Sequence, residues 1–121
     1  MEQNKPSELD SMHAAYKLEF EDVRTVFIPN TGFANYKFEA DGIYVQEVFV
    51  NKNVRGLRYA AKLTDLCLTE AEKQKEIKTI YTSVAVKGNE TINSSMIAIL
   101  RYGFKLLKSD SELIYFYKEN K

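Results

Sequence analysis

The chain has 121 residues, of which 45% are apolar and 12% aromatic. That length allows one domain with its own hydrophobic core and is too short for two ordinary domains. Seventeen Lys and Arg residues balance seventeen Asp and Glu residues, so the formal net charge is zero. Such a chain has no overall field to attract a nucleic acid or an anionic membrane, and any anion site must be local.

Cysteine content and hydropathy exclude further classes. Cys67 is the single cysteine, so no internal disulfide can form, and one Cys with one His cannot complete a structural zinc site. No apolar run approaches the ~20 residues that span a bilayer, and residues 1–7 contain no apolar signal core. We therefore expect an α/β or α+β domain over residues 1–121 in the reducing cytoplasm, without a metal or a membrane anchor.

A helix is predicted over residues 8–20. Ser7 fits the N-cap position, and an acid stands three residues later, as in a weak capping box. Apolar residues then recur at spacings of three and four. They form one stripe along the helix, made of Leu9, Met12, Tyr16 and Phe20.

Three antiparallel strands are predicted next, over residues 24–28, 33–40 and 43–50. The first is short and β-branched, and the Pro-Asn-Thr-Gly sequence that follows it is typical of a turn. Asp41-Gly42 separates the second strand from the third, and Asp-Gly between two such runs is a strong hairpin signal. Together these strands predict an antiparallel meander.

The period of the pattern then changes from strand to helix. Apolar residues from Ala60 to Ala71 define one face of a helix, and the charged residues 69–76 form its solvated end. Residues 77–86 follow as a nearly continuous apolar run. Such a run predicts a strand that is buried on both faces, as in a parallel sheet.

A second helix is predicted over residues 91–102, and Gly103 fits the position just beyond its C-terminus. Residues 104–108 and 113–117 predict a final hairpin. The apolar residues of this helix are spaced for a buried stripe made of Ile92, Met96, Ile99 and Leu100.

Residues 48–63, with the sequence V-F-V-N-K-N-V-R-G-L-R-Y-A-A-K-L, are the most informative segment. An apolar strand runs into a tight turn with one glycine and two arginines, and a helix starts directly on Ala60 and Ala61. Such a junction directs unpaired backbone N–H groups, the positive end of a helix dipole and guanidinium charge toward one point. That point suits a pyrophosphate.

This segment resembles the signature of the acetyl-CoA-dependent N-acyltransferases of the GNAT superfamily. The signature is a strand of the form L-x-V followed, five residues after the Val, by Arg-x-x-Gly-x-Gly/Ala at the start of a helix. Here Val48-Phe49-Val50 matches the strand, and Arg55 matches the leading Arg. Gly56 matches the common second Gly, and Ala60 the closing small residue. Arg58 stands where the family usually has its central Gly.

The order of the predicted elements over roughly residues 23–118 also resembles the superfamily, as does the Gly103-Phe104 exit from the last helix. The resemblance implies a mixed central sheet of about six strands with flanking helices. In that sheet an antiparallel meander joins a parallel pair of strands that splay apart. The family usually has a strand and two helices in front of the meander, so residues 1–22 form a reduced N-terminal segment.

The resemblance implies that acetyl-CoA lies between the splayed strands. The first strand would pair with the pantetheine arm as with a false strand, and the amide near Val48 would polarise the thioester carbonyl. The turn and the helix start would hold the pyrophosphate. The cofactor-binding residues are then Val48, Phe49, Val50, Arg55, Gly56, Leu57, Arg58, Tyr59 and Ala60.

Arg58 is the position of this turn that departs from the signature, and it lacks the freedom of Gly to adopt a positive φ. It must take a helical conformation with its side chain turned away, place its guanidinium on a phosphate, or block the cofactor.

The second helix matches the family less well. The family's usual Asn falls on Ile92, with Asn93 one residue away as a candidate contact of the pantetheine. The Tyr that often protonates the leaving thiolate falls on Ile99, and Tyr102 is the nearby candidate for that role. A thiolate with a pKa near ~8.5 is an adequate leaving group without such an acid.

The acceptor amine needs a base, because an ammonium with a pKa near ~10.4 must lose a proton before it attacks. Glu47 and Glu90 are the candidates. Three tyrosines could line the acceptor cleft, namely Tyr36, Tyr44 and Tyr115. His13 is interpreted as a solvated surface residue and Cys67 as a small core residue.

These features predict an N-acetyltransferase that moves acetyl from acetyl-CoA to a primary amine by direct attack in a ternary complex. The acceptor is an unknown small molecule, peptide or protein, and a homodimer could complete the open site. The departures from the family pattern at Arg58, Ile92 and Ile99 favour an alternative, a GNAT-shaped binding or assembly module without catalysis.

Overall fold

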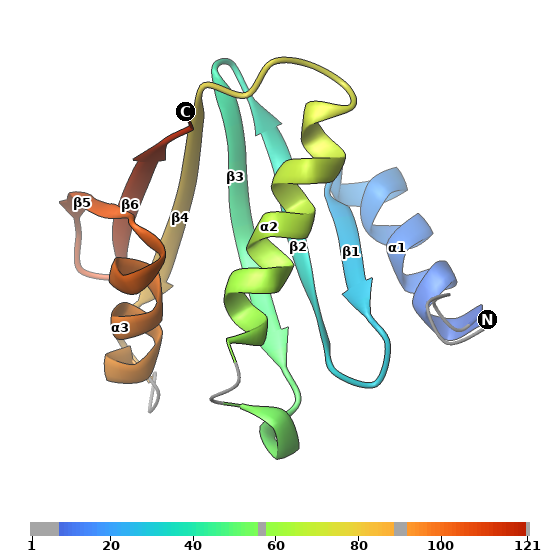
Figure 1. Cartoon of the computed structure of the whole chain (residues 1–121), viewed down its shortest axis with the longest axis horizontal. Helices are drawn as coiled ribbons and strands as arrows, with labels where there is room; N and C mark the ends of the chain where they lie inside the picture. Colours follow the sequence, from blue (N-terminus) through green and yellow to red (C-terminus); the bar gives the residue numbers. More distant parts are fainter. Residues whose placement is uncertain (1–7, 56–57, 89–91, 121) are drawn as a thin grey trace.

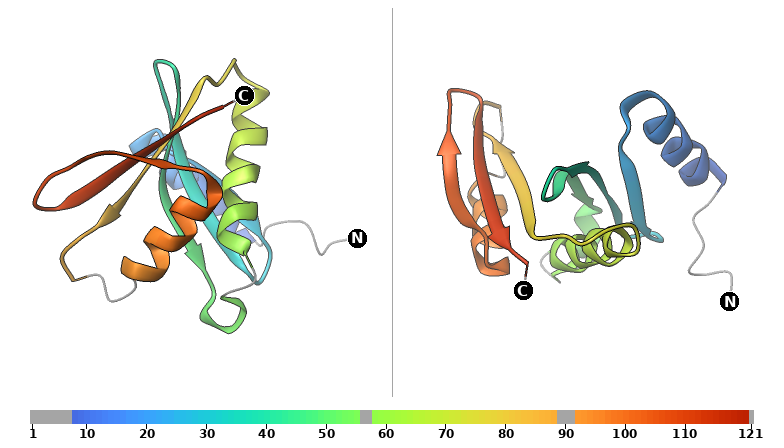
Figure 2. Two further views of the ribbon diagram at one scale, coloured as in Figure 1. Left: turned by 60° about the vertical axis from the view of Figure 1, so that its left-hand side comes forward. Right: turned by 90° about the horizontal axis from the view of Figure 1, so that it is seen from above.

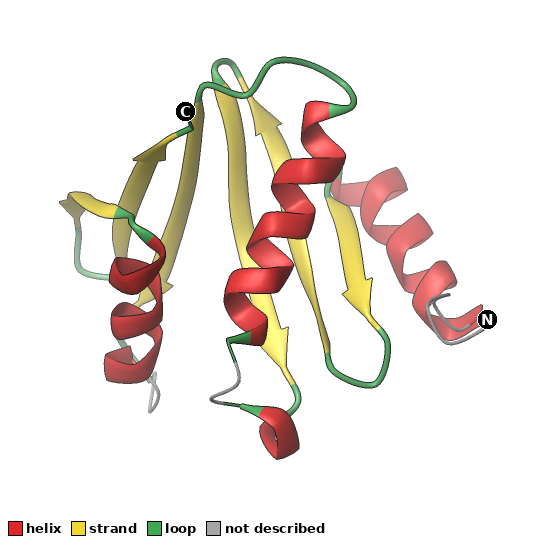
Figure 3. Ribbon diagram, viewed as in Figure 1, coloured by secondary structure: helices red, strands yellow, loops and turns green. Residues whose placement is uncertain are grey.

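The computed structural model of the chain describes residues 8–55, 58–88 and 92–120. Every helix and strand predicted from the sequence is present in it (Figure 1, Figure 3). The charged residues 73–76, predicted as the end of a helix, lie beyond it. The elements are α1 (Glu8–Glu21), β1 (Arg24–Ile28), β2 (Gly32–Glu39), β3 (Gly42–Val50), the 3₁₀ helix η2 (Lys52–Val54), α2 (Tyr59–Glu72), β4 (Thr79–Ala85), α3 (Ile92–Tyr102), β5 (Lys105–Ser109) and β6 (Leu113–Glu119).

The six strands form one mixed sheet in the order β1-β2-β3-β4-β6-β5. β1, β2 and β3 make the predicted antiparallel meander, and β4, β6 and β5 are antiparallel neighbours as well. β3 and β4 run parallel to each other. The predicted fold class, an antiparallel meander joined to a parallel pair, is therefore confirmed.

The helices cover the two faces of the sheet unequally. Figure 2 shows α2 and α3 on one face, which we call the front, and α1 beside β1 on the opposite face, which we call the back. The core lies under α2, where burial raises the pKa of the Cys67 thiol to about 12 and keeps it unreactive. Its residues include Val26, Ala34, Tyr36, Ile43, Val45, Leu63, Cys67, Ala71, Ile80, Val84 and Phe116.

β4 differs from its prediction, because only its front face is covered. Ile80, Thr82 and Val84 are buried, whereas Tyr81 and Ser83 between them are only half-buried on the back. The prediction of burial on both faces is therefore wrong. Its physical reason is the position of α1, which lies at the β1 edge of the sheet and leaves the back of β4 open (Figure 2).

The stripe on α3 is only partly buried. Ile92, Met96 and Ile99 pack against the core, as predicted, but Leu100 is half-exposed, so its predicted burial is wrong. Gly103 follows the helix with a φ of 116°, a conformation that favours glycine and confirms its predicted position. α3 is therefore held to the rest of the molecule along one narrow line of side chains.

Candidate active site at the divergence of two strands

β3 and β4 lie side by side only over their first residues. Their pairing extends from Gly42 opposite Thr79 to Val45 opposite Thr82. Beyond these residues the strands diverge toward their C-terminal ends (Figure 1). We call the diverging segments, residues 46–50 of β3 and 83–85 of β4, the V.

A bulge in β3 accounts for the divergence. Tyr36 of β2 is opposite Val45, but its neighbour Asn35 is opposite Glu47, so Gln46 has no opposite residue in β2. An extra residue of this kind bends and twists the strand that contains it. The bulge therefore turns the second half of β3 away from β4.

Hydroxyl groups close the apex of the V on both faces of the sheet. On the front, the buried Thr82 Oγ1 donates a hydrogen bond of 2.9 Å to the Val45 carbonyl. On the back, the hydroxyls of Tyr44 and Ser83 are hydrogen-bonded at 2.5 Å. Because these bonds satisfy polar groups where the strand pairing stops, the divergence is a defined geometry and not a frayed end.

The β3 side of the V presents an unoccupied strand edge. Residues 46–50 have β2 on one side, and in the described part of the chain no strand pairs with their other side. Val48 is 38% exposed and Phe49 is 49% exposed. The three residues predicted to bind the pantetheine arm, Val48, Phe49 and Val50, thus lie along an open edge.

The turn after β3 is held by its arginine. Arg55 Nε donates to the Val50 carbonyl at 3.0 Å, which uses one of the five N–H donors of the guanidinium. Asn51 accepts a hydrogen bond from the Asn53 backbone N–H at 3.1 Å and starts the η2 turn. Gly56 and Leu57, also predicted to bind the cofactor, lie outside the described residues.

α2 begins immediately behind this turn without a side-chain cap. Arg58 is its N-cap residue, and the Arg58 side chain makes no capping hydrogen bond. Tyr59 and Ala60, the remaining predicted pyrophosphate contacts, are in the first turn of the helix. The first N–H groups of α2 are therefore available to an external acceptor.

α3 begins at the same edge of the sheet as α2, next to the open ends of β3 and β4 (Figure 1). Asn93 is exposed in its first turn. Glu90, the second candidate base, lies outside the described residues. Two helix N-termini thus face the open side of the V, and both favour negative charge there.

Comparisons with known proteins agree with this geometry at the level of the fold. The chain is similar to a protein from Desulfovibrio desulfuricans described as an acetyltransferase of the GNAT family. The TM-score is 0.68 and the identity 10%, over 93% of this chain and 82% of that one. The chain has the GNAT fold. No model of a known protein family and no protein of curated function matches the sequence.

Two further structures with the GNAT fold cover nearly all of this chain. An IAA acetyltransferase from Bacillus cereus matches with a TM-score of 0.66 and 10% identity, over 98% of this chain and 89% of that one. The PaiA N-acetyltransferase from Thermoplasma acidophilum, solved in complex with coenzyme A, matches with a TM-score of 0.65 and 16% identity. This match covers 94% of this chain and 72% of that one.

Within this GNAT fold, Arg58 has a backbone conformation that favours glycine. Its φ is 63° and its ψ is 26°, in the left-handed region. The prediction that an Arg cannot adopt a positive φ here is therefore wrong. The chain keeps the left-handed turn that suits Gly and bears a strain of about 1–2 kcal/mol with a non-glycine residue.

Replacing Arg58 by Gly should relieve that strain. We expect the free energy of unfolding to rise by about 0.5–1 kcal/mol, because the relief exceeds the extra chain entropy of Gly. Urea unfolding measures this change.

Titration of the same variant with coenzyme A then defines the role of the Arg58 side chain. We expect several-fold weaker binding through loss of a phosphate contact, whereas tighter binding would identify Arg58 as an obstruction.

Tyr102 joins the two front helices. Its hydroxyl donates to Asp65 Oδ1 in α2 at 2.6 Å. Burial and this hydrogen bond raise the pKa of Tyr102 far above its usual range. As a proton donor to a leaving thiolate it would have to give up this bond, and it would be a weaker acid than an ordinary Tyr.

The Tyr102 bond predicts a specific pH dependence of stability. A raised pKa in the folded protein stabilises it fully below pH ~10, and this contribution is lost at higher pH because the unfolded phenol ionises first. Tyr102→Phe should lower the free energy of unfolding by about 1 kcal/mol near neutral pH. It should also lose less stability than the wild type as the pH rises above ~10 in urea unfolding. Parallel losses in both proteins would contradict the assignment.

Glu47 lies on the back of the sheet, one residue beyond the bulge. It accepts a hydrogen bond of 2.7 Å from the buried Asn35 side chain, and Asn35 in turn accepts one from Thr25. Lys17 Nζ of α1 lies 3.7 Å from the Glu47 carboxylate. The carboxylate is thus held in place while its side chain stays 54% exposed.

The three candidate tyrosines do not share one environment. Tyr36 is 3% exposed and packs in the core, so its predicted place in an acceptor cleft is wrong. Tyr44 is on the open back, and Tyr115 is opposite Ser83 in β6 on the same face. Tyr44, Ser83 and Tyr115 therefore form a hydroxyl-bearing surface behind the apex of the V.

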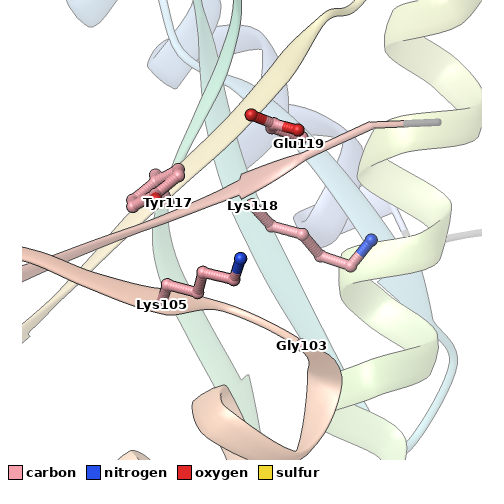
Figure 4. Close-up of a pocket in the computed structure, with 5 residues that line it drawn as sticks. All are labelled: Gly103, Lys105, Tyr117, Lys118 and Glu119. Atoms are coloured by element: carbon pink, nitrogen blue, oxygen red, sulfur yellow. The ribbon is translucent and has the colours of Figure 1, made fainter.

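Other features of the described ranges offer no competing site. One pocket of about 180 Å³ lies at the C-terminal hairpin and is lined by Gly103, Lys105, Tyr117, Lys118 and Glu119 (Figure 4). A second, of about 270 Å³, lies between α1 and the β1 edge. In these ranges no three His, Cys, Asp or Glu side chains gather as metal ligands. No helix there has the length and hydropathy to cross a bilayer.

Proposed function

We propose that the chain is an acetyl-CoA-dependent N-acetyltransferase. The observation that carries this proposal is the V, whose apex is closed by hydroxyls while two helix N-termini lie at its open side. An extended, amide-bearing pantetheine arm would pair with the free edge of β3. The pyrophosphate would lie at the start of α2, within reach of Arg55 and Arg58. The Thermoplasma relative, solved with coenzyme A, supports this assignment.

The proposed transfer crosses the sheet from front to back. The cofactor enters beside α2 and α3, and its thioester lies in the V with the carbonyl oxygen near the Val48 amide. The acceptor amine approaches from the back, where its lone pair attacks the carbonyl carbon. The Val48 N–H stabilises the oxyanion that develops. The carbon–sulfur bond then breaks, and the thiolate leaves.

Glu47 is the proposed base, directly or through one water. It lies on the acceptor side and its side chain is more than half exposed, so it can take the proton that the ammonium must lose. Tyr102 is proposed mainly to position α3 against α2. Its bond to Asp65 makes it a poor proton donor, and a thiolate leaves adequately at neutral pH without one.

An assay of free thiol release tests the proposal. The full chain is mixed with acetyl-CoA and each of three acceptor classes, namely a polyamine, an amino acid amide and a lysine-containing peptide, and the rate is compared with hydrolysis alone. Amine-dependent release with acetylated product is expected. Cofactor binding without transfer to any acceptor would instead favour the alternative, a GNAT-shaped binding module, which the residues Ile92 and Ile99 also favour.

A further inference from the structure

The apolar stripe predicted on α1 is present but faces solvent. None of its large side chains is buried by the described part of the chain. Folded monomers seldom expose contiguous apolar surface of this kind unless it binds a partner. The exposed fractions are 75% for Leu9, 68% for Met12, 56% for Tyr16 and 67% for Phe20.

The contacts of α1 place this stripe next to the back of the sheet. Lys17 reaches Glu47, and the ring of His13 lies 5.9 Å from that of Phe33 in β2. The opposite side of α1, with Ala14, Ala15 and Leu18, instead lines the pocket at the β1 edge. Helical spacing puts Leu9 and Phe20 beside His13. The stripe therefore adjoins the side of α1 that faces Glu47.

Aromatic residues continue the apolar surface toward the V. Phe33 stacks on Phe49 of β3, with ring centroids 5.7 Å apart. Phe49 is 49% exposed and belongs to the open strand edge. An apolar path thus runs from the α1 stripe through Phe33 to the proposed acetyl site.

The charge around this path is negative. α1 has four acidic residues and one lysine, and therefore a formal charge of −3 with His13 neutral. Glu8 and Glu19 border the stripe on the side of Met12, and Glu47 lies at the inner end. Two copies of this chain that met through α1 would oppose like charges. A basic segment would be complementary in both charge and hydropathy.

We infer that the α1 stripe docks a basic polypeptide segment with bulky apolar side chains. On the basis of the proposed function, we place the acceptor amine on this segment. Its apolar side chains would pack on the stripe, and a lysine or N-terminal amine would reach Glu47 along the aromatic path. There the cationic amine replaces Lys17 as the partner of the Glu47 carboxylate, and this contact aligns it with the back of the V.

Binding of a labelled peptide tests the inference independently of catalysis. The probe is a fluorescent peptide of alternating Lys-Lys and Leu-Leu pairs, and the binding is followed by anisotropy at physiological salt. The double variant Met12→Ser, Phe20→Ser should weaken binding about tenfold or more, because both side chains would be buried by the peptide. Leu106→Ser, a 62% exposed residue of β5 at the other edge of the sheet, is the matched control. It should change the dissociation constant less than twofold.

Kinetics separate this inference from the proposed function. In the double variant, KM for a lysine peptide should rise with the dissociation constant, while KM for acetyl-CoA and for a small amine stays unchanged. Stripe-dependent peptide binding without acetylation of any amine would overturn the proposed function and leave the docking site intact. Equal peptide binding by the double variant and the control would overturn the inference. So would a wild-type dimer in sedimentation that the double variant abolishes, because the stripe would then belong to a second copy.

Discussion

Glu47→Gln is expected to lower kcat for acetyl transfer by about 10²- to 10⁴-fold near neutral pH, the usual contribution of a positioned general base. The amide keeps the shape of the side chain and can still accept the hydrogen bond from Asn35, but it cannot take a proton. KM for acetyl-CoA should stay the same, because Glu47 lies on the back of the sheet. Steady-state kinetics on both substrates measure this separation.

The pH profile makes the test of Glu47 specific. Above the pKa of the amine, near ~10.4, the acceptor is already neutral and needs no base, so the variant should approach the wild-type rate. Glu76→Gln, at an exposed position between α2 and β4, is the matched control and should leave the rate unchanged. A Glu47→Gln enzyme that is as fast as wild type at pH 7 would show that another group takes the proton.

Gly42→Ala is expected to destabilise the fold by about 3 kcal/mol or more. A Cβ at this position would lie 1.7 Å from the carbonyl oxygen of Thr79. The oxygen belongs to the backbone of β4 and cannot turn away as a flexible side chain could, so β3 and β4 would have to move apart at this end of their parallel pairing. Urea unfolding measures the loss, and coenzyme A titration of any folded fraction should show weakened binding.

Gly88→Ala is the contrasting control for Gly42. No atom lies within 4 Å of a Cβ at Gly88, although its φ is +66°. The cost there is only that of a left-handed non-glycine residue, about 1–2 kcal/mol. Similar losses at Gly42 and Gly88 would contradict the close approach of the Gly42 and Thr79 backbones in the parallel pair.

Local sequence patterns were sufficient to predict where the helices and strands of this fold lie. Alternation of apolar residues located the strands, and the Asp41-Gly42 turn set the hairpin between β2 and β3. The spacing from Val48 to Ala60 located the strand, turn and helix of the proposed cofactor site. These features depend on residues that are close in the sequence, so a periodicity or a motif can reveal them.

Features that depend on distant parts of the chain were missed. Thr82 bonds to Val45, and Ser83 to Tyr44, across separations of 37 and 39 residues. A hydroxyl residue in a strand gives no signal of such a partner. The burial of Tyr36 likewise depends on α2 packing over β2, which the alternation within the strand does not reveal.

A helical spacing of apolar residues also does not show whether the rest of the chain covers them. Leu9 and Met12 have the spacing of a buried face but point to solvent, because no described element packs over them. The backbone conformation of Arg58 was likewise not evident from the local sequence. Its residue type disfavours a positive φ, and the strand before it and the helix after it impose one.

Thermal unfolding with and without acetyl-CoA tests most directly whether the V is a coenzyme A site. At a cofactor concentration about 100 times its dissociation constant, binding to the folded state should add about 2.7 kcal/mol to the free energy of unfolding. We expect a midpoint that rises with acetyl-CoA concentration. An unchanged midpoint at millimolar acetyl-CoA would contradict it.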